Sequence, residues 1–186
     1  GLDYESLRAA NPKLVYCSIT GYGATGPDAK RRAYDLTTQA MSGLMSVTGH
    51  PGNPPTNAGT PMGDTISAGF AFSAILGALF HRERTGEGQH IDISMTDVLF
   101  SLIFDESLDI YEDLGMSFQQ GNRIMRFSPF NAYPTQDGWL VIGIGHDAMW
   151  RALCDLIGRE DLGDHADWGR MDWRFEHNDQ VDAVVA

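Results

Sequence analysis

The sequence predicts an α/β fold, because strand-like apolar runs alternate with segments of helical periodicity. A helix over 2–10 precedes a buried strand over 14–19, and an apolar helix over 64–83 precedes a strand over 90–95. Towards the end of the chain, a strand–turn–strand pattern is followed by another helix, over 148–157. Three such alternations in one chain favour α/β over an all-helical or all-strand fold.

The first elements are separated by proline and glycine. Asn11-Pro12 ends the first helix, since proline restricts the residue before it. The spacing Gly21-x-Gly23-x-x-Gly26 after the first strand resembles a dinucleotide-binding fingerprint, in which a helix should open directly. Pro27 and further loop residues follow instead, so we reject a dinucleotide site here.

A second helix is expected from Tyr34 or Asp35 to Thr48, and the Gly- and Pro-rich stretch over 49–63 cannot form a regular element. The inner face of the helix expected over 34–48 is predicted to comprise Met41, Leu44, Met45 and Thr48. For the helix over 64–83, Asp64 suits the N-cap position. Its apolar surface is predicted to come from Ile66, Phe70, Ile75, Leu79 and Phe80. Small residues such as Ala71 and Ala78 make this helix slim enough to pack closely against another backbone.

The remaining elements follow in order: a turn over 85–88, the strand over 90–95, a helix over 97–111 and a loop over 115–129. A second unit then begins, with strands over 131–133 and 139–144 joined by the hairpin turn Asp137-Gly138. Its helix over 148–157 ends at Gly158, a suitable C′ glycine.

Composition is that of an ordinary globular protein, with 42% apolar and 20% charged residues. A net charge of −12 argues against general binding to nucleic acid or membranes. The longest apolar run, 68–80, is too short to span a bilayer, and two isolated cysteines indicate a reducing compartment. We therefore expect a cytoplasmic protein. The chain opens within a predicted helix already joined to a strand and stops at Val184-Val185-Ala186 without a capping signal, so we expect a fragment.

Two clusters could carry chemistry. The loop ending in Gly63-Asp64 would place a carboxylate near the unpaired N–H groups of a helix start, where it stays ionised and can attack an acyl group. The plainer alternative is that Asp64 only caps the helix. The second cluster is Lys30-Arg31-Arg32-Ala33-Tyr34-Asp35, in which the arginines could grip phosphates, Tyr34 could stack or donate a hydrogen bond, and Asp35 could orient a neighbour or cap a helix. The plainer alternative is a solvated loop followed by a capped helix.

Other reactive residue types give no site. The six histidines have no metal-type spacing, and Cys154 lies in an apolar helix where a core position is favoured over a nucleophile. We expect the four tryptophans to be core or interface residues.

A series of short motifs runs along nearly the whole chain: Asn11-Pro12-Lys13-Leu14-Val15-Tyr16, Ser18-Ile19-Thr20-Gly21-Tyr22-Gly23, Thr25-Gly26-Pro27, Tyr34-Asp35, Gln39-Ala40-Met41-Ser42-Gly43, Gly63-Asp64 and the segment from His81 to Gln89. In their order and spacing, these motifs together resemble the family III CoA-transferases (CaiB/BaiF type). That family includes formyl-CoA and carnitine CoA-transferases and α-methylacyl-CoA racemases.

The resemblance implies roles for particular residues. Asp64 matches the nucleophilic aspartate, Asp35 an acid near the reacting acyl group and Tyr34 an aromatic contact beside it. Arg32 matches a basic residue that touches CoA, and Met95 an apolar residue that lines the thioester region. Gly63 lets substrate approach. Gly121 begins a segment similar to a mobile covering loop, although it lacks the glycine run of the formyl-CoA enzymes.

Position 34 bears on the choice between activities. The resemblance implies that the racemases need a histidine immediately before the acid, as one of two bases that exchange the α-proton. Here that position is Tyr34, whose phenol, with a reference pKa of about 10, is a poor base at neutral pH. A CoA-transferase is therefore favoured. The alternatives are an α-methylacyl-CoA racemase or epimerase and a non-catalytic CoA-binding subunit.

The resemblance also implies an architecture: part of a Rossmann-like large domain over 1–115, a linker over 116–129 and part of a small α/β domain over 130–186. The whole protein would be an interlocked homodimer. Its substrates would be an acyl-CoA and a small carboxylic acid, joined through aspartyl anhydride and aspartyl-CoA thioester intermediates. That chemistry needs no ATP, metal or bound cofactor.

Overall fold

The computed structural model describes residues 1–104, 106, 108–124 and 126–186. The chain divides into two compact units, unit 1 (Gly1–Gln119) and unit 2 (Gln120–Ala186). Both units mix helices and strands, so the predicted α/β class is confirmed.

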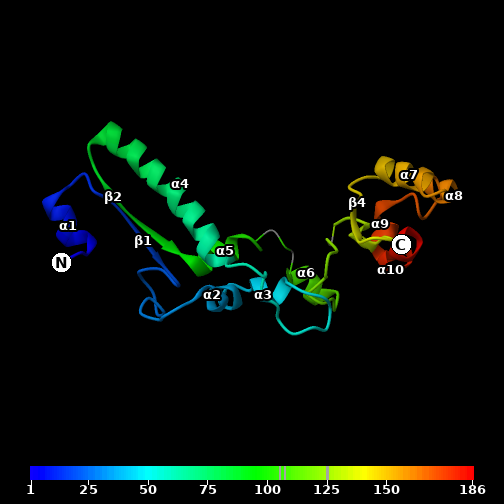
Figure 1. The fold of residues 1–186 in the computed structure, drawn as a ribbon, viewed down its shortest axis with the longest axis horizontal. Helices are drawn as coiled ribbons and strands as arrows, with labels where there is room; N and C mark the ends of the chain where they lie inside the picture. The colour runs from blue at the N-terminus through cyan, green and yellow to red at the C-terminus, as the bar shows by residue number, and fades with distance from the viewer. Residues whose placement is uncertain (105, 107, 125) are drawn as a thin grey trace. The chain divides into compact units, whose positions relative to one another are not determined.

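Unit 1 is organised around a parallel strand pair. β1 (Val15–Thr20) pairs with β2 (Gln89–Ser94) in register from Val15↔Gln89 to Thr20↔Ser94. α4 (Met62–Thr85) lies alongside both strands (Figure 1). Among the described residues after β1, the next helix begins at Asp35, so the loop expected after Gly26 and Pro27 in place of a helix is confirmed.

The face of α4 that packs inward is made of small residues. Gly63, Ser67, Ala71 and Ala78 are buried, at the spacing of one helical face. The prediction of a slim, closely packed helix is therefore confirmed. Of the side chains predicted to make its apolar surface, Phe70 and Phe80 are 46% and 65% exposed and so do not belong to the buried face.

By length and composition, α4 could also cross a membrane. It is the one helix in the described part of the chain that meets both criteria, so the expectation drawn from the shorter run over 68–80 underestimated it. Core helices of soluble proteins share these properties, and one side of α4 contacts β1, β2, α2 and α5.

The single helix expected over 34–48 is two helices. α2 (Asp35–Met41) ends at Ser42, and α3 (Leu44–Val47) starts after Gly43, whose φ of 88° is left-handed and favours glycine. The predicted inner face was partly wrong as well, because Met41 is 49% exposed. The side chains buried on this helix are polar: Thr38, Gln39 and Ser42.

The other helices of unit 1 differ from prediction mainly at their ends. α1 (Tyr4–Ala10) starts two residues later than expected, because the Asp3 carboxylate accepts from the Ser6 N–H and caps it. α5 (Met95–Ser101) starts at the last residue of the expected strand. It stops well before Tyr111, and α6 (Leu108–Asp113) is a separate helix. Positions 105 and 107 of the expected helix lie outside the described residues.

Unit 2 begins with the predicted hairpin. β3 (Phe130–Pro134) and β4 (Trp139–Gly143) are antiparallel, and the Thr135 N–H donates to the Gly138 carbonyl at 2.9 Å across the turn. α7 (Asp147–Leu156) follows as expected, with Gly158 left-handed after it. Three further helices were not predicted: α8 (Glu160–Gly163), α9 (Met171–Glu176) and α10 (Asn178–Val185).

These helices enclose a core around Trp150, Cys154 and Val181, all fully buried. The prediction that Cys154 is a core residue is confirmed, and burial raises the pKa of its thiol. Trp168 and Trp173 pack against this core, whereas Trp139 is 74% exposed and is not a core residue within the described chain.

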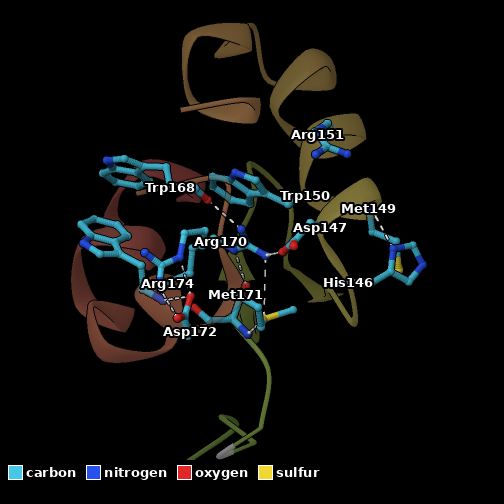
Figure 2. Close-up of polar contacts among 12 residues, drawn as sticks. His146, Asp147, Met149, Trp150, Arg151, Trp168, Arg170, Met171, Asp172 and Arg174 are labelled. Atoms are coloured by element: carbon cyan, nitrogen blue, oxygen red, sulfur yellow. Dashed lines mark hydrogen bonds and ion pairs between the residues drawn. The ribbon is translucent and has the colours of Figure 1, made fainter. Parts of the chain in front are cut away.

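A buried guanidinium ties unit 2 together. Arg174 donates to the carbonyls of Ser128 (3.0 Å) and Trp168 (2.7 Å) and to the Asp147 carboxylate (2.9 Å). Its guanidinium also lies over the Trp150 ring at 4.9 Å (Figure 2). Burial lowers the pKa of Arg174, and the partnership with Asp147 opposes that shift. One side chain thus joins α9, α7 and the approach to β3.

Candidate active site

Asp64 is the third residue of α4, with Pro61 at the N-cap. The expectation that Asp64 itself caps this helix was therefore wrong, and so was the alternative that capping is its only role. Asp64 is an exposed residue in this chain. The side chain is thus accessible to a reactant.

A different carboxylate occupies the helix start. Oδ1 of Asp35, the first residue of α2, accepts from the Gly63 N–H at 2.6 Å and from the Asp64 N–H at 3.4 Å. An acid at this end interacts favourably with the helix dipole and with the unpaired N–H groups. The N–H groups of Gly63 and Asp64, at the helix start that was expected to have unpaired N–H groups, are therefore paired with Asp35.

Gly63 sits where an added side chain would be crowded. A Cβ added there would lie 2.8 Å from Thr38 Oγ1, 3.0 Å from Asp35 Oδ1 and 3.2 Å from Met95 Cε. The same distances show that Met95 lies against the start of α4. The structure therefore brings together four residues singled out from the sequence: Asp35, Gly63, Asp64 and Met95.

Gln39 also belongs to this cluster, although only its family motif was noted from the sequence. Its Nε2 donates to Asp35 Oδ2 at 2.6 Å and to the Thr60 carbonyl at 3.1 Å, and its Oε1 accepts from the Ala58 N–H at 3.0 Å. The side chain is fully buried. The i, i+4 spacing of Asp35 and Gln39 was the available signal, since it places both on one helix face.

Tyr34 and Arg32 are both exposed, unlike the buried Gln39 at the centre of this cluster. Tyr34 is 84% exposed, and its backbone N–H donates to Thr37 Oγ1 at 2.9 Å. Arg32 is exposed in the loop before α2. Within the described ranges, no hydrogen bond or ion pair joins the Arg32 side chain to Asp35 or Asp64.

Gly121 belongs to unit 2 and has a left-handed φ of 66°. Two residues later, Arg123 donates through Nε (3.0 Å) and Nη2 (2.7 Å) to Asp182 on α10. The Tyr133 hydroxyl donates to the same carboxylate at 2.5 Å. Burial, reinforced by Asp182, raises the pKa of Tyr133. The chain just after Gly121 is thus anchored within unit 2.

A separate cavity of about 370 Å³ opens in unit 1 where β1 and β2 end. The carboxyl ends of parallel strands are a usual place for ligands. Its polar lining includes Asp92, whose Oδ2 accepts from the Ala24 N–H at 2.7 Å, together with Asp97 and Ser101. No cluster of three or more metal-ligating side chains occurs in the part of the chain that the structure describes.

The family model for "CoA-transferase family III" matches residues 1–186. The chain belongs to CoA-transferase family III. It is 39% identical over its whole length to the succinate–glutarate CoA-transferase of Agrobacterium fabrum, of which it covers 46%. It is 40% identical, again over its whole length, to the acetyl-CoA:oxalate CoA-transferase of Acetobacter aceti, of which it covers 48%.

Solved structures agree with this membership. A CaiB/BaiF family protein from Brucella suis superposes with a TM-score of 0.78 at 35% identity, over 99% of this chain and 49% of its own. The hypothetical protein Rv3272 from Mycobacterium tuberculosis gives 0.82 at 30% identity, over 100% and 50%. The family III chain thus spans about half the length of the relatives it matches.

Proposed function

We propose that the whole protein transfers coenzyme A from an acyl-CoA to a carboxylic acid, with Asp64 as the nucleophile. One observation carries the proposal: in a family III chain, an exposed aspartate stands on the first turn of α4, next to a glycine whose neighbours crowd any added side chain. The relatives' names support small acids as substrates, since they specify succinate, glutarate and oxalate.

In the proposed reaction, the Asp64 carboxylate attacks the donor thioester carbonyl, and CoA thiolate leaves to give a mixed anhydride. The thiolate then attacks the Asp64 carbonyl of that anhydride, forming an aspartyl-CoA thioester and releasing the donor acid. The acceptor carboxylate attacks this thioester, expelling the thiolate, which attacks the acceptor carbonyl of the second anhydride and restores Asp64. Each step exchanges one acyl bond for another, so no external energy source is needed.

The remaining residues receive supporting roles. Asp35 holds the first turn of α4, and Met95 gives the thioester an apolar wall against Gly63. We propose that Arg32 binds CoA phosphate, because its guanidinium is exposed and phosphate is a favourable bidentate partner. Tyr34 contributes an aromatic contact rather than a base.

We further propose that unit 1 is part of the large domain and unit 2 part of the small domain of an interlocked, cytoplasmic homodimer. Exposed aromatic side chains on α4, including Phe72 and Phe80, support this, because such apolar surface is normally covered. In the assembled protein the same cover would exclude water from the anhydrides.

The test is CoA exchange by the full-length protein, with succinyl-CoA as donor and glutarate or oxalate as acceptor. We expect transfer to at least one acid, and a fall of at least about 1000-fold in Asp64→Asn, since the covalent route is lost. Glu83→Gln, which alters an exposed carboxylate at the far end of α4, is the matched control and should retain activity. Normal exchange by Asp64→Asn would refute the proposal. α-Proton exchange of 2-methylacyl-CoA without an acceptor would indicate a racemase instead.

A further inference from the structure

We infer that Gln39 is a positioning residue that sets the place of the nucleophile through Asp35; this rests on the proposed function of Asp64. Gln39 touches no reacting atom in that scheme. Its contacts join three separate pieces of chain: the loop at Ala58–Thr60, the start of α2 and, through Asp35, the start of α4.

The orientation of the Gln39 amide is determined by its partners. The Ala58 N–H can only donate, so the atom facing it at 3.0 Å must be the amide oxygen. The nitrogen therefore faces the two acceptors, Asp35 Oδ2 and the Thr60 carbonyl. A flipped amide would oppose donor to donor and acceptor to acceptor. Because the side chain is fully buried, water cannot replace these partners.

The carboxylate of Asp35 is in turn held at both oxygens. Oδ2 accepts from Gln39, while Oδ1 accepts from the Gly63 and Asp64 N–H groups. The Gln39 contact therefore fixes the rotation of the carboxylate, and that rotation fixes where Oδ1 meets the first turn of α4. A displacement of about 1 Å can cost about 100-fold in rate, so this contact can matter without touching substrate.

Gln119 offers a matched comparison in the same unit. It is 8% exposed, and its Nε2 donates to the carbonyls of Thr48 (2.8 Å) and Pro54 (3.2 Å). It thus also clamps the long loop before α4, but both of these acceptors are backbone carbonyls and neither is a carboxylate. A change at Gln119 tests loop clamping alone, whereas a change at Gln39 tests loop clamping and the link to Asp35.

The decisive variant is Gln39→Glu, which places a second carboxyl against Asp35. Two carboxyls in one site cannot both ionise freely, so the pair retains a proton at low pH. While it is protonated, the introduced carboxyl can donate to Asp35 as the amide did, and the link is lost as pH rises and the pair ionises. Of the helices packed against α2, α3 has no ionisable side chain, α5 carries Asp97, and α4 carries Asp64 at this end. The groups at 81–84 lie about 25 Å along α4.

The experiment compares full-length wild type, Gln39→Glu, Gln39→Met and Gln119→Glu in CoA exchange from succinyl-CoA to glutarate or oxalate, whichever the wild type accepts. For each variant, kcat is divided by the wild-type kcat at every pH, which cancels titrations common to both. For Gln39→Glu we expect a ratio near one at the acidic end that falls by up to about 100-fold as pH rises, with KM less affected. Gln39→Met should give a lowered ratio that does not change with pH, and Gln119→Glu a ratio without that alkaline loss.

A thermal unfolding midpoint measured across the same pH range does not depend on activity and shows whether each variant folds. If Gln39→Glu fails to fold, Gln39→Met still decides: a kcat equal to that of the wild type would overturn the inference. So would a Gln39→Glu ratio that is flat with pH or that follows Gln119→Glu. Absence of transfer by the wild type at every pH would count against the proposed function itself, which keeps the two failures distinct.

Discussion

Units 1 and 2 are stabilised in different ways. Unit 2 has a core of fully buried large side chains, Trp150 and Val181 among them, crossed by the buried guanidinium of Arg174. Around the candidate site, unit 1 buries small and polar groups instead, including Gly63, Ser67 and Gln39. Its aromatic side chains on α4 face outward.

This contrast separates a region held by packing from one held by a polar framework. Loss of side-chain volume anywhere in a packed core lowers its stability, whereas a hydrogen-bonded framework fixes the position of particular atoms. Unit 1 carries the candidate nucleophile, and its framework converges on the turn that bears it. We therefore expect the stability of unit 2 to fall when a buried side chain such as Arg174 is removed. The stability of unit 1 should fall when atoms are added near Gly63.

The largest expected effect is that of Arg174→Met in unit 2. The change leaves the carbonyls of Ser128, which is buried, and Trp168, which is partly buried, without their donor, and should lower the free energy of unfolding by about 3 kcal/mol or more. All four tryptophans lie in unit 2, so urea unfolding followed by tryptophan fluorescence reports on it. Arg151→Met, which removes an exposed ion pair with Asp164, should cost less than about 1 kcal/mol. Equal losses would show that Arg174 is not the link described.

Next in size is Gly63→Ala in unit 1. Its Cβ would meet Thr38 Oγ1 and Asp35 Oδ1 at 2.8 and 3.0 Å, so either these side chains or the first turn of α4 must shift, at a cost of about 1–3 kcal/mol. Gly69→Ala and Gly77→Ala are controls on the same helix, where nothing lies within 4 Å, and each should stabilise the 186-residue chain by up to about 1 kcal/mol. Far-UV circular dichroism during urea unfolding measures both. A stabilising Gly63→Ala would contradict the crowding at this turn.

The same controls sharpen the comparison in the full-length protein. If the outer face of α4 is covered there, an added methyl group at Gly69 or Gly77 meets a neighbour and loses its benefit. Stabilisation of equal size in the chain and in the full-length protein would indicate that this face stays open.

A smaller effect is expected for Tyr133→Phe, which removes the hydroxyl that donates to Asp182 and should cost about 1 kcal/mol at neutral pH. Because the pKa of Tyr133 is raised in the folded protein, its contribution is complete below the unfolded value of about 10 and declines above it. Wild-type stability should therefore fall with alkaline pH more steeply than that of the variant. Parallel slopes in tryptophan-monitored unfolding would contradict the raised pKa.

The smallest expected difference is in the rate at which a thiol reagent labels one cysteine from each unit. Burial raises the pKa of both Cys17 and Cys154, but Cys17 is only half-buried whereas Cys154 is fully buried. With a thiol reagent at mildly alkaline pH, Cys17 should react first, and Cys154 only as unit 2 opens. Peptide mass spectrometry locates the label. Earlier labelling of Cys154 would show that unit 2 is the looser region.

Much of the fold was predictable because residue alternation and turn residues determine the strands and turns in which they lie. The strands around Val15–Thr20 and Gln89–Ser94, the hairpin at Asp137-Gly138 and the stop at Gly158 follow from alternation and turn chemistry. The break at Gly43 was not predicted, because the apolar pattern continues across it. The three short helices after Glu160 were missed because each is stabilised by the core around Trp150 and Val181 rather than by its own periodicity.

The candidate site was predictable in its residues but not in its connections. Asp64 and Asp35 were singled out separately, and only the structure shows that Asp35 takes the N–H groups at the start of α4. A contact across 28 residues leaves no trace in local spacing. The role of Gln39 was missed for a related reason, since the sequence does not show which groups a glutamine side chain contacts.

The most direct test of Asp64 as the nucleophile is chemical trapping in the full-length protein. The enzyme is incubated with succinyl-CoA and hydroxylamine, which intercepts an aspartyl anhydride or thioester, and the peptide containing Asp64 is then analysed by mass spectrometry. We predict a hydroxamate at Asp64 that needs succinyl-CoA and is absent from Asp64→Asn. An unmodified Asp64 in protein that is turning over succinyl-CoA would contradict the account.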